Sequence, residues 1–170
     1  KAAGESAYVI QRHVRGMNAS GADSGEAGAV ARPRVGLFVT CLANIYRPNV
    51  GLAAVALLER AGCTVEVPMT QTCCGQPSYN NGDLDGAAKT ARQTIEALEE
   101  FDYVVAPSGS CGGMLRDFPR LFASEPGWRH RAQAMADRTY ELISFLTDIR
   151  GVKSVDAAFP HRVTYHDSCH

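Results

Sequence analysis

Short β-branched and aromatic stretches alternate with longer amphipathic stretches along this chain, and this alternation constrains its fold more than any other feature. The stretch 34–40 has no polar face, as expected for a strand buried on both sides of a parallel sheet. Further strands are predicted at 64–67, 103–106 and 163–165, and helices at 49–61, 84–101, 114–122 and 128–147. The alternation predicts a Rossmann-like, doubly wound α/β fold with a parallel sheet.

A cysteine follows each of the first three predicted strands. Cys41 comes directly after the first strand, the adjacent Cys73 and Cys74 lie in the loop after the second, and Cys111 lies in the loop after the third. Ligands of open α/β sheets bind beyond the carboxyl ends of the strands. We therefore expect these four cysteines to converge at one edge of the sheet.

Four thiolates around one centre suit either tetrahedral zinc or an iron–sulfur cluster. Structural zinc sites usually take their sulfurs from pairs spaced Cys-x2-4-Cys, and this chain has no such pair. Cys73 and Cys74 have no spacer, but adjacent cysteines can reach two different iron atoms, so a cluster is favoured over zinc. Buried or redox-active free thiols are the third interpretation. Gly75 and Gly112 would let backbone amides approach the cluster sulfurs.

The cysteines stand within longer motifs that together resemble one known family. These motifs are Phe38-Val39-Thr40-Cys41, Gly62-Cys63, Cys73-Cys74-Gly75-Gln76-Pro77, Pro107-Ser108-Gly109-Ser110-Cys111 and Tyr165-His166-Asp167-Ser168-Cys169-His170. They resemble the cysteine-rich CCG-domain family, which includes the cysteine-rich component of heterodisulfide reductase, the iron–sulfur subunit of glycolate oxidase and lactate utilization protein A. The likeness to lactate utilization protein A is greatest, and it covers Arg34 to His170.

The resemblance implies an iron–sulfur oxidoreductase subunit that carries electrons in the oxidation of L-lactate, a 2-hydroxy acid, to pyruvate. Its cofactor would be a [4Fe–4S] cluster held by Cys41, Cys73, Cys74 and Cys111. The implied partners are a ferredoxin-like iron–sulfur subunit and a further small subunit of the same complex, together with the small hydroxy-acid substrate. A glycolate oxidase subunit and a heterodisulfide-reductase-like subunit are the alternatives within the family.

The sequence departs from the family pattern at two positions. The family motif ends in Cys-x-x-Cys, and Met114 occupies its last position, which leaves four ligands for a [4Fe–4S] cluster rather than five for a non-cubane one. Family members carry two CCG halves, and Cys169 resembles the opening cysteine of the second half. We therefore expect a piece of a longer protein, with an extended or disordered tail and linker at 1–33, a first CCG domain at 34–161 and the start of a truncated second half at 162–170.

Four other residues with possible metal-binding side chains, Cys63, Met114, His166 and His170, are expected to lie outside the site. Cys63 is predicted to be a packed core thiol, Met114 to fill the core, and His166 and His170 to flank a strand end. The sequence assigns no catalytic residue.

Composition and missing motifs exclude several other classes of function. The 17 basic and 18 acidic side chains give a net charge of −1, which does not indicate a nucleic-acid partner. No apolar run is long enough to span a membrane, and no secretory signal is recognised, so a cytoplasmic location is expected. Gly-x-Gly-x-x-Gly and Walker motifs are absent, so bound nucleotide is not predicted. A non-catalytic assembly module stabilised by zinc or free thiols is the alternative from another class.

Overall fold

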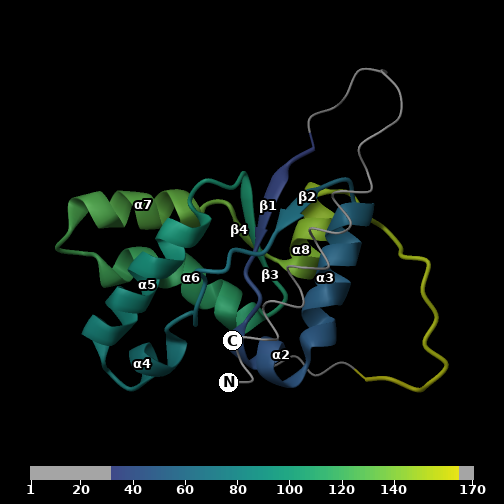
Figure 1. Ribbon diagram of the computed structural model, residues 1–170, viewed down its shortest axis with the longest axis horizontal. Coiled ribbons are helices and arrows are strands. Elements are labelled where there is room, and N and C mark those ends of the chain that lie inside the picture. Colours follow the sequence, from purple (N-terminus) through teal and green to yellow (C-terminus); the bar gives the residue numbers. More distant parts are fainter. Residues whose placement is uncertain (1–31, 165–170) are drawn as a thin grey trace.

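The computed structural model describes residues 32–164, and its centre is a parallel β-sheet (Figure 1). Within these residues the sheet has four strands in the order β2-β1-β3-β4, and all neighbouring pairs are parallel. The strands are β1 (Arg34–Leu37), β2 (Thr64–Glu66), β3 (Tyr103–Ala106) and β4 (Thr139–Glu141). The α/β class and the parallel sheet predicted from the sequence are confirmed.

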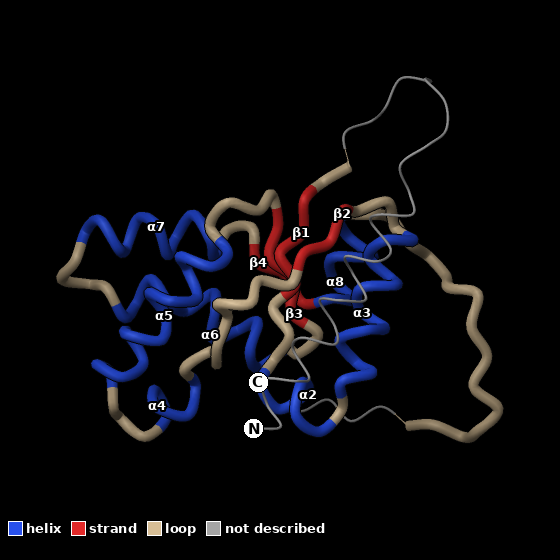
Figure 2. Tube along the Cα trace, viewed as in Figure 1, coloured by secondary structure: helices blue, strands red, loops and turns tan. Residues whose placement is uncertain are grey.

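Helices cover both faces of the sheet, as a doubly wound fold requires (Figure 2). One buried cluster joins the sheet to α3 (Pro48–Arg60), α8 (Leu142–Ser144) and the π-helix η1 (Phe145–Ile149). A second joins the opposite face to α5 (Leu84–Leu98), α6 (Gly109–Leu121) and α7 (Pro126–Ala136). Two short helices, α2 (Cys41–Tyr46) and α4 (Gln76–Asn80), complete the elements.

Local chemistry explains where two of the covering helices begin. Pro48 occupies the first position of α3, where its missing N–H costs no helical hydrogen bond. Asp83 caps α5, because its carboxylate accepts a hydrogen bond of 2.9 Å from the Gly86 amide. Within α5, Ala88, Ala91, Ile95 and Leu98 are buried against the core, whereas Leu84 in the first turn is exposed.

The helix predicted at 128–147 is wrong, because the chain leaves the helix after Ala136 and forms β4. Tyr140 and Glu141 pair with Val105 and Ala106 of β3, so sheet hydrogen bonds replace the helical ones. Ile143, which lies within the predicted helix, follows β4 and is 57% exposed. An apolar spacing that continued through the strand concealed this break.

Other element bounds differ from the prediction as well; α5, for example, ends at Leu98 rather than at residue 101. β1 ends at Leu37 rather than at residue 40, and α6 begins at Gly109 rather than at Met114. Val163 and Thr164 lie in no strand, contrary to the predicted strand 163–165, whose last residue falls outside the described range.

The division into a tail at 1–33, a first domain at 34–161 and a second half at 162–170 stays a prediction. Residues 1–31 and 165–170 lie outside the part of the chain that the structure describes. Within 32–164, no helix is both long and apolar enough to cross a membrane.

Candidate metal centre

Cys41 and Cys73 come together at the carboxyl edge of the sheet. Cys41 is the first residue of α2, and the Thr40 hydroxyl caps this helix by accepting a hydrogen bond of 3.3 Å from the Ala43 amide. The Cys41 thiol donates to the Cys73 sulfur, with 3.8 Å between the two Sγ atoms. Burial, this hydrogen bond and the nearby charge of Cys73 raise the pKa of Cys41, while the Leu42 amide donates to the Cys41 sulfur and opposes them.

The loop that carries Cys73 and Cys74 is fixed to the sheet and to α5. The Gln71 side-chain amide donates to the Leu37 carbonyl at the end of β1, over 3.2 Å. The hydroxyl of Thr94, a fully buried residue of α5, lies 3.5 Å from the Cys73 carbonyl and 3.1 Å from the Thr90 carbonyl, so the two oxygens share its hydrogen. Cys74 is 3% exposed and packs in the cluster beside α5 and α6. The loop therefore presents Cys73 to the edge and Cys74 to the core.

Cys111 completes the group from the first turn of α6, not from a loop as predicted. The Cys74 thiol donates a hydrogen bond to the Cys111 sulfur, which lowers the pKa of Cys111 to about 6 against the opposing effect of burial. The hydroxyls of Ser108 and Ser110 also hydrogen-bond to this sulfur and lower its pKa. The same hydrogen bond from Cys74, together with burial, raises the pKa of Cys74, whose sulfur accepts from the Gln76 amide.

The two glycines of the predicted site differ in what their backbone requires. Gly75 has φ +81°, in the left-handed region that side chains rarely adopt, and it directly precedes α4. Gly112 is a buried residue inside α6, where glycine is a poor helix former. A Cβ added at Gly112 would meet only the Ala106 Cβ, at 4.0 Å, so the chain leaves room there that an alanine would occupy.

The comparison with known families places this sulfur-rich edge within one family. Residues 35–116 match the family described as the cysteine-rich domain, CCG. Residues 35–116 of this chain are therefore a CCG domain. Cys41, Cys73, Cys74 and Cys111 all lie inside the matched range.

Three of the curated proteins similar to this chain share the name lactate utilization protein A. Lactate utilization protein A from Geobacillus thermodenitrificans is 48% identical over 137 residues, which cover 81% of this chain and 57% of that protein. The protein of the same name from an Exiguobacterium species is 51% identical over 140 residues, which cover 81% of this chain and 57% of that protein. The Bacillus subtilis protein is 47% identical over 137 residues, which cover 81% of this chain and 58% of that protein. The chain thus spans little more than half the length of these relatives. No solved structure matches it significantly.

The thiols of the CCG domain fit an iron–sulfur cluster in number and in chemistry. The group supplies four soft sulfur ligands. The backbone amides of Leu42 and Gln76 donate hydrogen bonds to the sulfurs of Cys41 and Cys74. Hydrogen bonds of this kind surround the ligating sulfurs of iron–sulfur clusters. The thiols lie as two hydrogen-bonded pairs, Cys41 with Cys73 and Cys74 with Cys111. Among residues 32–164, no three His, Cys, Asp or Glu side chains surround a point that could hold a single metal ion.

Cys63 and Met114 were both predicted to pack in the core, and both are buried there. Cys63 is 1% exposed and packs in the cluster beside α3, on the other face of the sheet from Cys74. Burial raises its pKa, against the charges of Arg150 and Arg32. Met114 is 5% exposed and packs in the core. Cys169, His166 and His170 lie outside the described residues.

Sequence reasoning missed two residues of the site, Ser108 and Ser110. Their hydroxyl oxygens lie 3.3 Å apart beside Cys111. The available signal was a serine at the residue before a helix, but the prediction began this helix five residues too late, at Met114 rather than Gly109.

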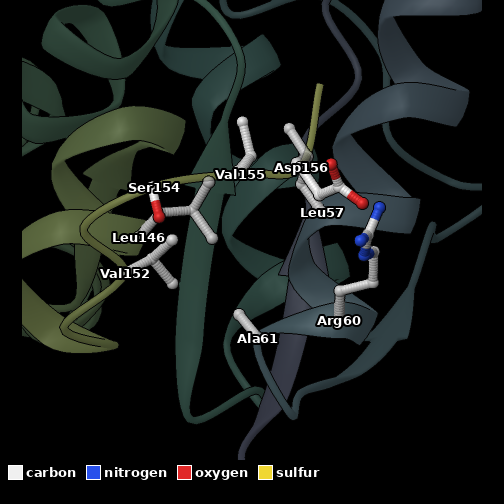
Figure 3. A pocket seen from close by; sticks show the side chains of 8 residues that line it. All are labelled: Leu57, Arg60, Ala61, Leu146, Val152, Ser154, Val155 and Asp156. Carbon is white, nitrogen blue, oxygen red and sulfur yellow. The ribbon is translucent and has the colours of Figure 1, made fainter. Parts of the chain in front are cut away.

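A pocket of about 260 Å³ is lined by none of the four cysteines of the site (Figure 3). It lies between the end of α3 and the segment after η1, and Leu57, Ala61, Leu146, Val152 and Val155 give it largely apolar walls. Arg60, Ser154 and Asp156 supply its polar groups. Since the end of α3 leads into β2, this wall of the pocket lies toward the amino end of β2, whereas the four cysteines follow the carboxyl ends of the strands.

Proposed function

We propose that this chain is part of an iron–sulfur oxidoreductase subunit that carries electrons in the oxidation of L-lactate to pyruvate. The observation that carries the proposal is the meeting of Cys41, Cys73, Cys74 and Cys111 at the carboxyl edge of the sheet. The name lactate utilization protein A, shared by the relatives above, supports the substrate.

In this proposal the four cysteines hold a [4Fe–4S] cluster, which when bound accepts and releases single electrons. The protein's own residues give the centre its position and surroundings. Cys74 holds its sulfur in the apolar core, while Cys41, Cys73 and Cys111 are only half-buried and so face the edge where a partner can approach. The amides of Leu42 and Gln76 donate to the sulfurs of Cys41 and Cys74, and Gly112 leaves room for a methyl-sized group next to Cys111.

Lactate oxidation to pyruvate releases two electrons and two protons, and a [4Fe–4S] cluster takes up one electron at a time, so the proposal needs a further acceptor. We propose that the acceptor is a ferredoxin-like iron–sulfur subunit, with a further small subunit in the same complex. We further propose that residues 34–161 form the first of two CCG halves and that 162–170 begin the second. The greater length of the curated relatives supports this division.

Anaerobic reduction of the full-length protein by its substrate tests the proposed function. The protein is purified anaerobically with its partner subunits, and L-lactate is added while visible absorbance and EPR are recorded. The proposal predicts bleaching and a reduced-cluster EPR signal with L-lactate, and none with D-lactate. Reduction by glycolate instead would favour the glycolate oxidase alternative, and reduction by a dithiol would favour the heterodisulfide-reductase-like one. Stoichiometric zinc without sulfide would overturn electron transfer in favour of an assembly module.

A further inference from the structure

The sulfur atoms of the site obtain their hydrogen-bond donors from two different sources. At Cys41 and Cys74 the outer donors are backbone amides, those of Leu42 and Gln76, which the fold supplies whatever the side chain. At Cys111 the outer donors are two side-chain hydroxyls, those of Ser108 and Ser110. Substitution can therefore remove the donors of Cys111 without altering the backbone.

Ser108 does not perform the role that its position normally gives a serine. It is the residue before α6, with extended backbone angles of φ −162° and ψ 121°, where a serine hydroxyl usually accepts a hydrogen bond from an amide of the first helical turn. No such side-chain cap forms here. The hydroxyl instead lies 3.3 Å from the Ser110 hydroxyl and bonds to the Cys111 sulfur. Diverting this hydroxyl from a cap that normally stabilises a helix indicates a role at the sulfur.

The two hydroxyls can supply the sulfur with at most two hydrogens. Each serine carries a single O–H hydrogen. If each serine donates to the sulfur, the sulfur receives two hydrogens. If one serine instead donates to the other across the 3.3 Å contact, the sulfur receives one; either oxygen can be that donor. Both arrangements leave at least one O–H hydrogen available to the Cys111 sulfur. The first turn of α6, which begins at Gly109, holds both oxygens in place.

We propose that Ser108 and Ser110 are positioning residues that orient Cys111 and raise the reduction potential of the cluster, an inference that rests on the proposed function. Hydrogen bonds to a ligating sulfur stabilise the more negative, reduced state and so shift the potential upward. A donor that is a side chain makes this shift adjustable by a single residue. Ser108 and Ser110 thus set how readily an electron is accepted at the edge where Cys111 lies.

Substitutions that remove or retain each hydroxyl test this role in the full-length protein. The variants are Ser108→Ala, Ser110→Ala and the hydroxyl-retaining Ser110→Thr. Ser124→Ala is the matched control, because Ser124 is exposed beyond the far end of α6. Iron and acid-labile sulfide are measured first, and the midpoint potential is then determined by anaerobic redox titration followed by EPR. Resonance Raman spectra in H₂O and D₂O report hydrogen bonds to the cluster sulfurs.

The inference predicts a lower midpoint potential in both alanine variants, with iron content unchanged, and wild-type potentials in Ser110→Thr and Ser124→Ala. It also predicts a deuterium shift of the iron–sulfur stretching bands that shrinks in the alanine variants. Potentials equal to wild type in an iron-loaded Ser108→Ala or Ser110→Ala would overturn the inference and leave the proposed function intact. Loss of iron from these variants would also overturn tuning, since the serines would then serve assembly. Absence of iron and sulfide from the wild type would instead overturn the proposed function.

Discussion

Replacing Gly112 by alanine should raise the stability of the metal-free protein and lower its iron content. Gly112 lies in the interior of α6, where its amide donates to the Ser108 carbonyl over 2.9 Å. Glycine is about 1 kcal/mol less favourable than alanine at such a position. The new methyl group would meet only the Ala106 Cβ, at the ordinary contact distance of 4.0 Å, so no strain offsets this gain.

The expected stabilisation is therefore about 1 kcal/mol, roughly a fivefold change in the folding equilibrium. For a chain of this size it corresponds to a rise in Tm of roughly 2–4 °C. Urea unfolding followed by circular dichroism, with chelator and reductant present, measures it. Iron and sulfide are then compared in anaerobically purified samples, where the methyl group beside Cys111 should reduce both because it fills room that the centre needs.

The control is Gly127→Ala in α7, where a new Cβ meets nothing within 4 Å. It should leave iron unchanged and should not lower the stability. A Gly112→Ala variant that binds as much iron as the wild type would refute the idea that this glycine leaves room for the cluster. A destabilised metal-free variant would refute the packing inferred around Gly112.

Three further substitutions test the packing and the backbone around the site. Gly36→Ala should destabilise the protein by about 1–3 kcal/mol, because its Cβ would lie 2.6 Å from Phe101 Cδ2 and 2.8 Å from Leu98 Cδ2; urea unfolding with an unchanged midpoint would contradict this. Gly75→Ala and Gly82→Ala should both cost about 1–2 kcal/mol, since their φ angles are +81° and +79°. Only Gly75→Ala should also lose iron, and equal iron loss in both would show a general effect of strain.

The sequence predicted the fold and the cysteine group because both depend on local patterns repeated along the chain. The strand 103–106 was predicted with the observed bounds, and the cysteines after three strands had to meet because parallel strands share a carboxyl edge. β4 was missed because Thr139–Glu141 becomes a strand only through pairing with β3, which no local pattern records.

The details of the site could not be read from the sequence for a related reason. The hydroxyl of Ser108 is free to bond to Cys111 only because α6 begins at Gly109 without a side-chain cap. The pairing of Cys41 with Cys73 depends on how the loop is fixed by Gln71 and Thr94, residues far apart in the sequence. Such contacts follow from tertiary structure rather than from spacing.

Metal analysis of matched cysteine variants tests most directly whether these cysteines hold an iron–sulfur cluster. Anaerobically purified full-length wild type, Cys73→Ala and Cys63→Ala are compared for iron, acid-labile sulfide and zinc. Cys73 is half-buried in the site, and Cys63 is a buried thiol outside it. We predict about four irons and four sulfides per CCG half in the wild type and in Cys63→Ala, with a marked loss in Cys73→Ala. Zinc in place of iron, or the same iron content in Cys73→Ala as in the wild type, would contradict the presence of a cluster at this site.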